Sequence, residues 1–312
     1  MASQPHLPGN GPAAGPLTAL PSGRITGRLT PAFWIPLGWI LVVLVSAATA
    51  GWWPMPAPDH MNWRHFAAPP GTAGGRVVLQ EAESAGSYVH WLGTDTMGRD
   101  NLSRIVYGAR VSLSVGLLAP LIGLVAGGLL GCIAGFYRGR LESVIVTAMD
   151  VILAFPGLVL LVVVSFYLGA SLGKLILALG FLTLPAFCRV ARAAALALAE
   201  REFVAAARLS GAGNLSILCR EIIPNVTIPV AGYGLMVAAF LIMAEGALSF
   251  LGLGVPAPTP SWGGMIAEGK EILDAAPHVS GVPAAVLFLT VLSFNLIGDS
   301  IRSTIERQKG QL

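Results

Sequence analysis

The sequence predicts an all-α integral membrane protein with six transmembrane helices. Hydrophobic residues make up 54% of its 312 residues and charged residues 11%, and the mean hydropathy is +0.73. So few polar residues cannot cover a soluble globular protein of this length. A net charge of +3 gives no indication of nucleic-acid binding. Cys132, Cys188 and Cys219 are interpreted as packing residues, since their spacing fits neither a disulfide framework nor a metal site.

Six apolar runs predict the transmembrane helices, because about 20 apolar residues cross a hydrocarbon core of ~30 Å. The first run is long and has aromatic ends, which favours a retained helix over a cleaved signal peptide. Phe155-Pro156-Gly157 interrupts the third run, and Pro156 and Pro185 are expected to kink their helices. The predicted helices are 32–53, 111–137, 143–168, 172–198, 226–253 and 282–301.

The segments outside these helices complete the predicted domain organisation. Residues 1–31 are rich in Pro, Gly, Ala and Ser, which predicts a disordered cytoplasmic tail. Residues 54–110 have mixed charge and no sustained apolar run, which predicts an extracytoplasmic segment. Residues 111–302 are the predicted five-helix core, and residues 303–312 a second cytoplasmic tail. With the amino terminus inside, 12 of the 19 Lys and Arg residues fall on the cytoplasmic side, which favours two cytoplasmic termini.

Two further sequence patterns are interpreted as structural: a group of charged residues before the second helix and a spacing of glycines within it. Asp95 or Asp100 is expected to cap a short helix and to pair with Arg99 or Arg104. We interpret these as exposed, structural ion pairs rather than substrate contacts. Glycines at four-residue spacing in the second helix predict a close helix–helix contact; they are Gly127, Gly128, Gly131 and Gly135.

Two carboxylates inside the predicted spans are candidates for the translocation path or for helix pairing. Glu245 lies in the fifth predicted helix, and Asp150 lies nearer an interface in the third. An unpaired charge at the centre of a membrane helix costs at least ~2.5 kcal/mol. Glu245 is therefore expected to be paired or near the outer mouth, with hydrogen bonding between helices favoured over contact with a peptide amine.

The longest charged interruption of the core is the segment 199–225. Helix formers at 205–209, Gly211 as a left-handed helix end and Asn214 as a cap predict a helix, a turn and a second helix. This segment resembles the coupling loop of ABC importer permeases, which in that family lies on the cytoplasmic face and docks into a cleft of an ATPase subunit. The family motif usually opens with Glu, where this chain has Ala205. An ordinary amphipathic connector is the alternative. The motif positions are Ala205, Ala206, Ala207, Arg208, Gly211, Ala212 and Pro224.

Three further stretches resemble the peptide and nickel permeases of the ABC class. Residues 93–113 contain Asp-x-x-Gly-Arg-Asp before the second helix, residues 244–265 resemble the exit of the fifth helix, and residues 294–302 the end of the sixth. The resemblance runs in order from 93 to 302. It implies the type I ABC importer permease fold.

The resemblance also implies a function. The chain is expected to be a non-catalytic permease subunit of an ATP-driven, binding-protein-dependent importer in the bacterial inner membrane, carrying di- or oligopeptides. The implied partners are a homologous permease, two ATPase subunits and an external solute-binding protein, besides membrane lipid. ATP and magnesium are expected on the ATPase subunits, with no cofactor in this chain, because it contains no G-x-x-x-x-G-K-[ST] phosphate loop.

The sequence leaves several alternative functions open. Within the class, the solute is alternatively nickel or another small solute, since the binding protein and the partner permease share its selection. From different classes, the alternatives are an ion-coupled secondary transporter or channel, which needs a chain of buried ionisable groups, and a structural membrane scaffold. A metal-ligand role of His60 and His65 is less favoured than simple solvation.

Overall fold

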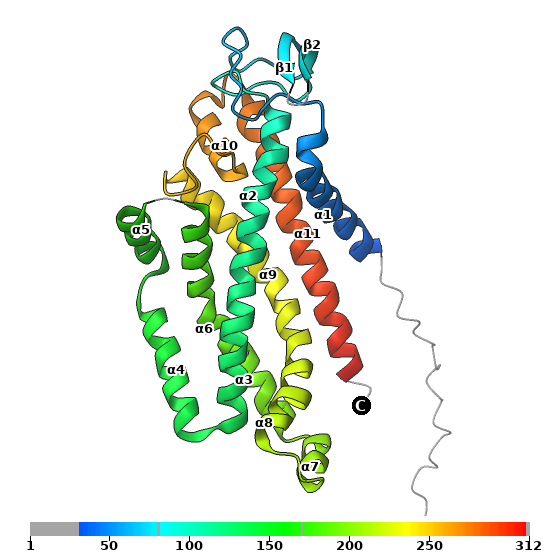
Figure 1. Cartoon of the computed structure of the whole chain (residues 1–312), viewed down its shortest axis with the longest axis vertical. Helices are drawn as coiled ribbons and strands as arrows, with labels where there is room; N and C mark the ends of the chain where they lie inside the picture. Colours follow the sequence, from blue (N-terminus) through cyan, green and yellow to red (C-terminus); the bar gives the residue numbers. More distant parts are fainter. Residues whose placement is uncertain (1–30, 80–81, 170, 310–312) are drawn as a thin grey trace, which may run out of the picture.

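The computed structural model describes residues 31–79, 82–169 and 171–309 of the chain, so the predicted tail at 1–31 lies outside the described residues except for Pro31, which begins α1. Its helices lie roughly along one axis and form an elongated bundle (Figure 1). A β-hairpin and α10 lie at one end, which we call the hairpin end, and α7 and α8 lie at the other, which we call the loop end. The elements follow one another as α1 (Pro31–Thr49), η1 (Ala50–Trp52), β1 (Thr72–Leu79), β2 (Ala82–His90), α2 (Asn101–Ile122), η2 (Gly123–Gly127), α3 (Gly128–Tyr137), α4 (Gly139–Ala154), α5 (Gly157–Leu168), α6 (Leu172–Ala199), α7 (Glu202–Leu209), α8 (Asn214–Ile217), η3 (Leu218–Ile222), α9 (Ile223–Phe250), α10 (Trp262–Gly269), η4 (Lys270–Ile272) and α11 (Pro277–Lys309).

The described helices fit the predicted number of membrane crossings. Five of them are long and apolar enough to span a membrane, and α4 with α5 forms a sixth if this pair is counted as one span. That pair is bent by 75° at the break between Ala154 and Gly157, because Pro156 cannot continue a regular helix. The predicted interruption of the third helix is thereby confirmed.

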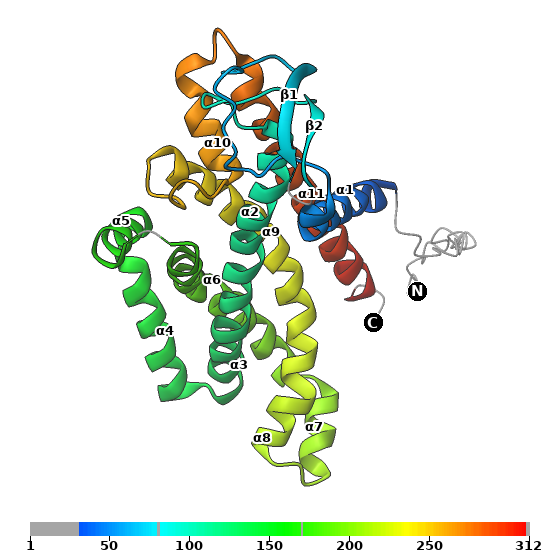
Figure 2. The ribbon, with the colours of Figure 1, turned by 45° about the horizontal axis from the view of Figure 1, so that its top comes forward.

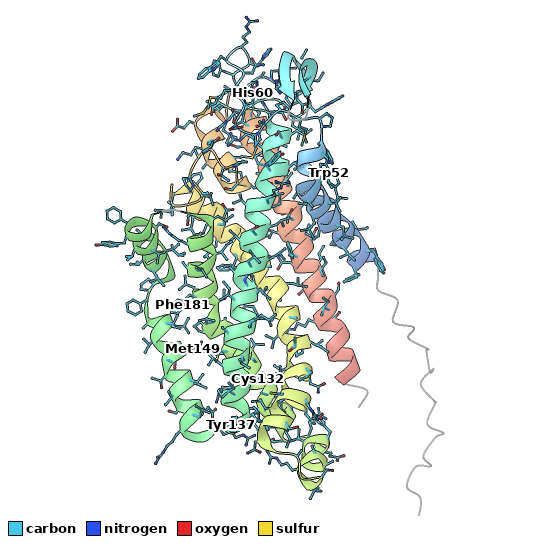
Figure 3. All side chains as sticks on the ribbon, viewed as in Figure 1. Trp52, His60, Cys132, Tyr137, Met149 and Phe181 are labelled. Atoms are coloured by element: carbon cyan, nitrogen blue, oxygen red, sulfur yellow. The ribbon has the colours of Figure 1, made fainter. Side chains whose placement is uncertain are left out.

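Close packing of α3 on α6 uses the predicted glycines. A methyl group on Gly135 would lie 2.6 Å from the Arg192 carbonyl oxygen, and one on Gly131 would overlap the Cys188 carbonyl. Gly128 faces open space instead. The four-residue spacing of Gly127, Gly131 and Gly135 thus puts three bare backbone positions on one face of the helix, against a neighbouring backbone. On the outer side, Met149 of α4 is buried against this pair (Figure 3).

Several predicted boundaries are wrong, because hydropathy locates the apolar part of a helix and not its polar ends. The second long helix begins at Asn101 rather than at 111, within the predicted extracytoplasmic segment. The last helix runs from Pro277 to Lys309, so the predicted tail at 303–312 is helical up to 309. The connection between α3 and α4 is the single residue Arg138, and both Arg138 and Gly139, the first residue of α4, have positive φ.

The segment 54–100 contains a β-hairpin that the sequence analysis does not predict. β1 and β2 pair as an antiparallel hairpin, which is the one sheet of the described residues in an otherwise helical chain. The hairpin lies over the start of α2 at the hairpin end (Figure 1). His60 lies among the side chains of this end (Figure 3).

Candidate functional site

The segment 199–225 forms a compact projection at the loop end of the bundle (Figure 2). α7 ends in a turn at Gly211, whose φ of +82° is the left-handed conformation that glycine adopts without strain. The amide groups of Gly211 and Ala212 donate to the carbonyl oxygens of Arg208 and Ala207, both at 3.0 Å, and so close the end of α7. The predicted helix and turn are confirmed. The predicted cap is wrong, since Gly213 occupies the N-cap of α8 and Asn214 is its first residue.

This projection is anchored to the bundle on one side. Val204 is fully buried with Ile217 and Ile222 in the same apolar cluster. The guanidinium of Arg208 lies 5.9 Å from the ring centre of Phe136 at the end of α3. An exposed ion pair at 2.7 Å also joins Arg138 to Glu200.

The projection also exposes two large apolar side chains. Leu209 is 90% exposed and Leu215 is 68% exposed, on either side of the Gly211 turn. Ala205 and Ala206 are also exposed, whereas Ala207 and Ala212 are half-buried. Burial of exposed leucines is a common source of affinity between proteins, so this surface is suited to a protein partner.

The second half of the segment is the beginning of a long helix. α8, η3 and α9 run on without a break from Asn214 to Phe250, 37 residues in all, so the predicted separate second helix and the predicted start of the fifth helix at 226 are both wrong. The π-turn η3 precedes Pro224, which has no amide hydrogen to donate to the preceding turn. Cys219 lies in this π-turn and is exposed, while Cys132 and Cys188 are buried.

Glu245 lies near the hairpin end of the same long helix and is fully buried. Its Oε2 accepts a hydrogen bond from Ser112 Oγ of α2 at 3.1 Å, and its Oε1 accepts one from Ser249 Oγ at 2.8 Å. Ser261, the residue that caps α10, lies 3.4 Å from Ser249 through their hydroxyl oxygens. The structure therefore places the carboxylate where α2, α9 and α10 meet.

A second polar cluster holds the other end of α10. Asp95 binds Arg99 through a 2.6 Å contact of its Oδ2 with Nε, and it also contacts Arg104. Glu268 of α10 accepts from both arginines at 2.7 Å. Arg99, Arg104 and Asp95 have side chains only 2–3% exposed, so the prediction of exposed ion pairs is wrong.

Asp100 performs the capping role foreseen for this region, on the long helix α2. Its Oδ2 accepts from the Ser103 amide at 2.8 Å, and its Oδ1 lies 2.8 Å from His90 Nδ1. Tyr88 donates to the same carboxylate at 3.2 Å. Burial and then the Asp100 charge raise the pKa of Tyr88 above its usual value. The phenol therefore stays protonated as a donor across the ordinary pH range.

The remaining candidates are separate from these clusters. Asp150 of α4 forms an exposed ion pair with Arg189 of α6 at 2.7 Å. His65 and His90 have ring centres 6.1 Å apart, and within the described ranges no group of three or more His, Cys, Asp or Glu is arranged to hold a metal ion.

Comparisons with known proteins decide the family. Residues 127–310 match the family described as the binding-protein-dependent transport system inner membrane component. The chain belongs to this family. The glutathione transport system permease protein GsiD of Pectobacterium atrosepticum is 38% identical to this permease over 220 residues, which are 70% of this chain and 73% of that one. The protein of the same name from Escherichia coli O157:H7 is 40% identical over the same shares.

The fold of this permease is that of a type I ABC importer. A chain of the inward-facing MetNI methionine ABC transporter superposes with a TM-score of 0.53 at 18% identity, and the match covers 65% of the permease and 96% of that chain. Taken together with the family, this makes the chain a multi-pass membrane permease of an ABC importer, as the sequence predicts.

Sequence reasoning missed most of the residues that surround Glu245 and Arg104 in the permease. The position of Ser261 could have been predicted from the sequence, because a serine directly before a short helical run is a typical N-cap. Ser112 and Glu268 had no such local signal. They lie 133 residues from Glu245 and 164 residues from Arg104, so only the tertiary fold brings each pair together.

Proposed function

We propose that this permease imports di- or oligopeptides, a class that includes the tripeptide glutathione. The observation that carries the proposal is its 38–40% identity, over 70% of the chain, to permeases named for glutathione transport. Nickel or another small solute is the alternative within the same class of importers.

The proposed complex contains this chain, a homologous permease that completes the path, two ATPase subunits and an external solute-binding protein. The chain itself is non-catalytic, and ATP with magnesium binds to the ATPase subunits. The segment 199–225 docks on one of them. Two features support this role. Val204 is buried against the bundle, and Leu209 is exposed to a partner, so that a displacement of the exposed residues is passed to the bundle. ATP-driven closure then switches the bundle between inward and outward access.

In the proposed orientation, the loop end and both termini are cytoplasmic in the bacterial inner membrane. Arginines at the loop end support this orientation, because positive charge gathers on the cytoplasmic side. Arg99 and Arg104 at the hairpin end are consistent with it, since Asp95 and Glu268 neutralise them. The loop-end arginines are Arg138, Arg140, Arg201, Arg208 and Arg220.

Transport by the reconstituted importer tests the proposal. The permease is co-purified with its partner permease and ATPases, placed in proteoliposomes with the binding protein encoded beside it, and supplied with radiolabelled glutathione, dialanine or Ni²⁺. We expect uptake of a peptide that requires ATP on the side of the ATPases and resists a proton ionophore. Uptake of Ni²⁺ alone would overturn the peptide assignment. Uptake that needs an ion gradient and not ATP would favour the secondary transporter.

A further inference from the structure

The hydrogen bonds around Glu245 all point toward its carboxylate. Ser112 Oγ accepts from the Trp262 amide at 3.3 Å, so its single hydroxyl hydrogen is left to donate to Glu245. Ser261 Oγ accepts from the Gly264 amide at 3.0 Å and lies 3.4 Å from Ser249 Oγ, which in turn donates to Glu245. Both amides belong to the first turn of α10, where unpaired N–H groups carry partial positive charge. The hydroxyls relay this charge to the carboxylate.

Packing around the carboxylate leaves little room for independent movement of α10. A methyl group on Gly263 of α10 would overlap the backbone of Gly246, the neighbour of Glu245 in α9. Trp262 is fully buried, and its Nε1 donates to the Ile105 carbonyl of α2 at 3.0 Å. Separation of α10 from α9 would take the Trp262 amide away from Ser112 and the Ser261 hydroxyl away from Ser249, the two serines that donate to Glu245. Buried polar groups would then lose their partners, which is costly.

The same helix reaches the opposite end of the bundle. From Asn214, directly after the Gly211 turn, to Glu245 the chain is one uninterrupted helix. At 1.5 Å per residue this part is about 45 Å long. A displacement of the loop end is therefore delivered to the position of Glu245 by a single element.

We propose that Glu245 is a positioning residue that fastens α10 and α2 to the hairpin end of α9, so that ATP-driven displacement of the segment 199–225 also moves α10. This inference rests on the proposed function, because it assigns that segment to the ATPases. The fastening makes α10 follow α9 at the mouth that faces the binding protein. Without it, packing such as that of Gly263 on Gly246 still links α10 to α9, but the outer mouth responds less to movement of the loop end.

The test compares coupling in the reconstituted importer with radiolabelled glutathione and dialanine as probes. Glu245→Gln turns one carboxylate oxygen into an NH2 donor, so that one of the two serine hydroxyls can no longer donate to this side chain, while Ser112→Ala removes the α2 bond directly. For either variant we expect near-normal assembly and basal ATPase activity, and about tenfold less peptide taken up per ATP hydrolysed, the change expected from losing one hydrogen bond to a charged group. The double variant is expected to lose less coupling than the product of the two single losses, because both changes act on the Ser112–Glu245 bond.

Ser293→Ala is the matched control. Ser293 is also a buried serine, but its hydroxyl donates to the Leu289 carbonyl of its own helix at 2.7 Å. Its uptake per ATP is expected to equal that of the parent permease. A second readout follows α10 itself. In a background without the exposed Cys219, a nitroxide on Thr259→Cys, an exposed position in the connection to α10, is expected to change mobility with nucleotide, and to change less when Glu245→Gln is added.

The outcomes separate this inference from the proposed function. No ATP-dependent uptake by the parent importer means that the proposed function has failed. Parent uptake with unchanged coupling in both variants overturns the role of Glu245. Parallel loss of assembly, ATPase activity and uptake, with a normal nucleotide response at position 259 in the residual complex, assigns Glu245 to stability alone and also overturns the inference.

Discussion

Arg104 of α2 and Glu268 of α10 form a two-bond salt bridge, with Nη1 2.7 Å from Oε2 and Nη2 3.1 Å from Oε1. The arginine is buried, and Asp95 shares its charge. The bridge joins residues 164 positions apart and holds the carboxyl end of α10 against the start of the second long helix. Together with Ser261 at the amino end, it fixes α10 at both ends.

Removal of this arginine is expected to destabilise the permease. Arg104→Ala leaves the two carboxylates Asp95 and Glu268 with Arg99 as their one remaining arginine. Breaking a buried pair from one side costs about 3–5 kcal/mol. The measurement is the thermal unfolding of the purified permease in detergent. Asp150→Asn is the control, because it breaks an ion pair whose side chains are 53% and 59% exposed and is expected to cost at most about 1 kcal/mol. Equal effects of the two changes would contradict the importance of burial.

The Gly211 turn is expected to be required for transport and not for membrane insertion. Gly211→Val forces a β-branched residue to φ +82°, at a local cost of about 1–3 kcal/mol, and misaligns α7 with the long helix. The variant should assemble in the membrane and transport poorly in the proteoliposome assay. Gly213→Ala is the control, because its φ of −70° suits any residue and its surroundings are open. Normal import by Gly211→Val would remove the turn from the mechanism.

The contact of α3 with α6 is expected to tolerate no side chain at Gly131. Gly131→Ala brings a methyl group onto the Cys188 carbonyl, and overpacking of this kind costs about 1–3 kcal/mol. Gly128→Ala, on the open side of the same helix, is expected to leave the unfolding temperature unchanged or to raise it slightly. Thermal unfolding of both variants checks the prediction, and a neutral Gly131→Ala would mean that the two helices move apart without cost.

The apolar crossings, the break at Pro156 and the turn at Gly211 could be predicted because each is a local property of the chain. Hydropathy reports about 20 residues at a time, and Pro and Gly act on their own backbone. The glycine face of α3 was also readable, since a four-residue spacing is periodic along one helix.

The polar start of α2 and the surroundings of Glu245 could not be predicted, because both depend on contacts with other parts of the chain. Asn101 and Ser103 look like loop residues, yet they are buried because Pro56 and Leu92 supply carbonyl acceptors from outside the helix. Glu245 looks like an isolated membrane charge until the fold brings Ser112 to it. A partner that lies 133 residues away leaves no mark on the local pattern.

Cys219 offers a direct test of orientation and docking. It is exposed in the π-turn after α8, and Cys132 and Cys188 are buried. In a variant with Ser at those two positions, a membrane-impermeant maleimide is expected to label Cys219 in inverted membrane vesicles and not in intact cells, because the thiol then faces the cytoplasm. A cysteine introduced at the exposed Thr259 in a background without Cys219 is the control, with the opposite sidedness expected.

Addition of the ATPase subunits extends the same measurement to the docking site. Cys219 lies in the same projection as the exposed Leu209 and Leu215, so a subunit seated on these leucines is expected to slow maleimide labelling several-fold, while labelling at position 259 is unchanged. Labelling of Cys219 from outside the cell would reverse the proposed orientation. Labelling from inside at the same rate with and without the ATPases would move their docking site away from this segment and weaken the argument that α9 carries ATP-driven movement to Glu245.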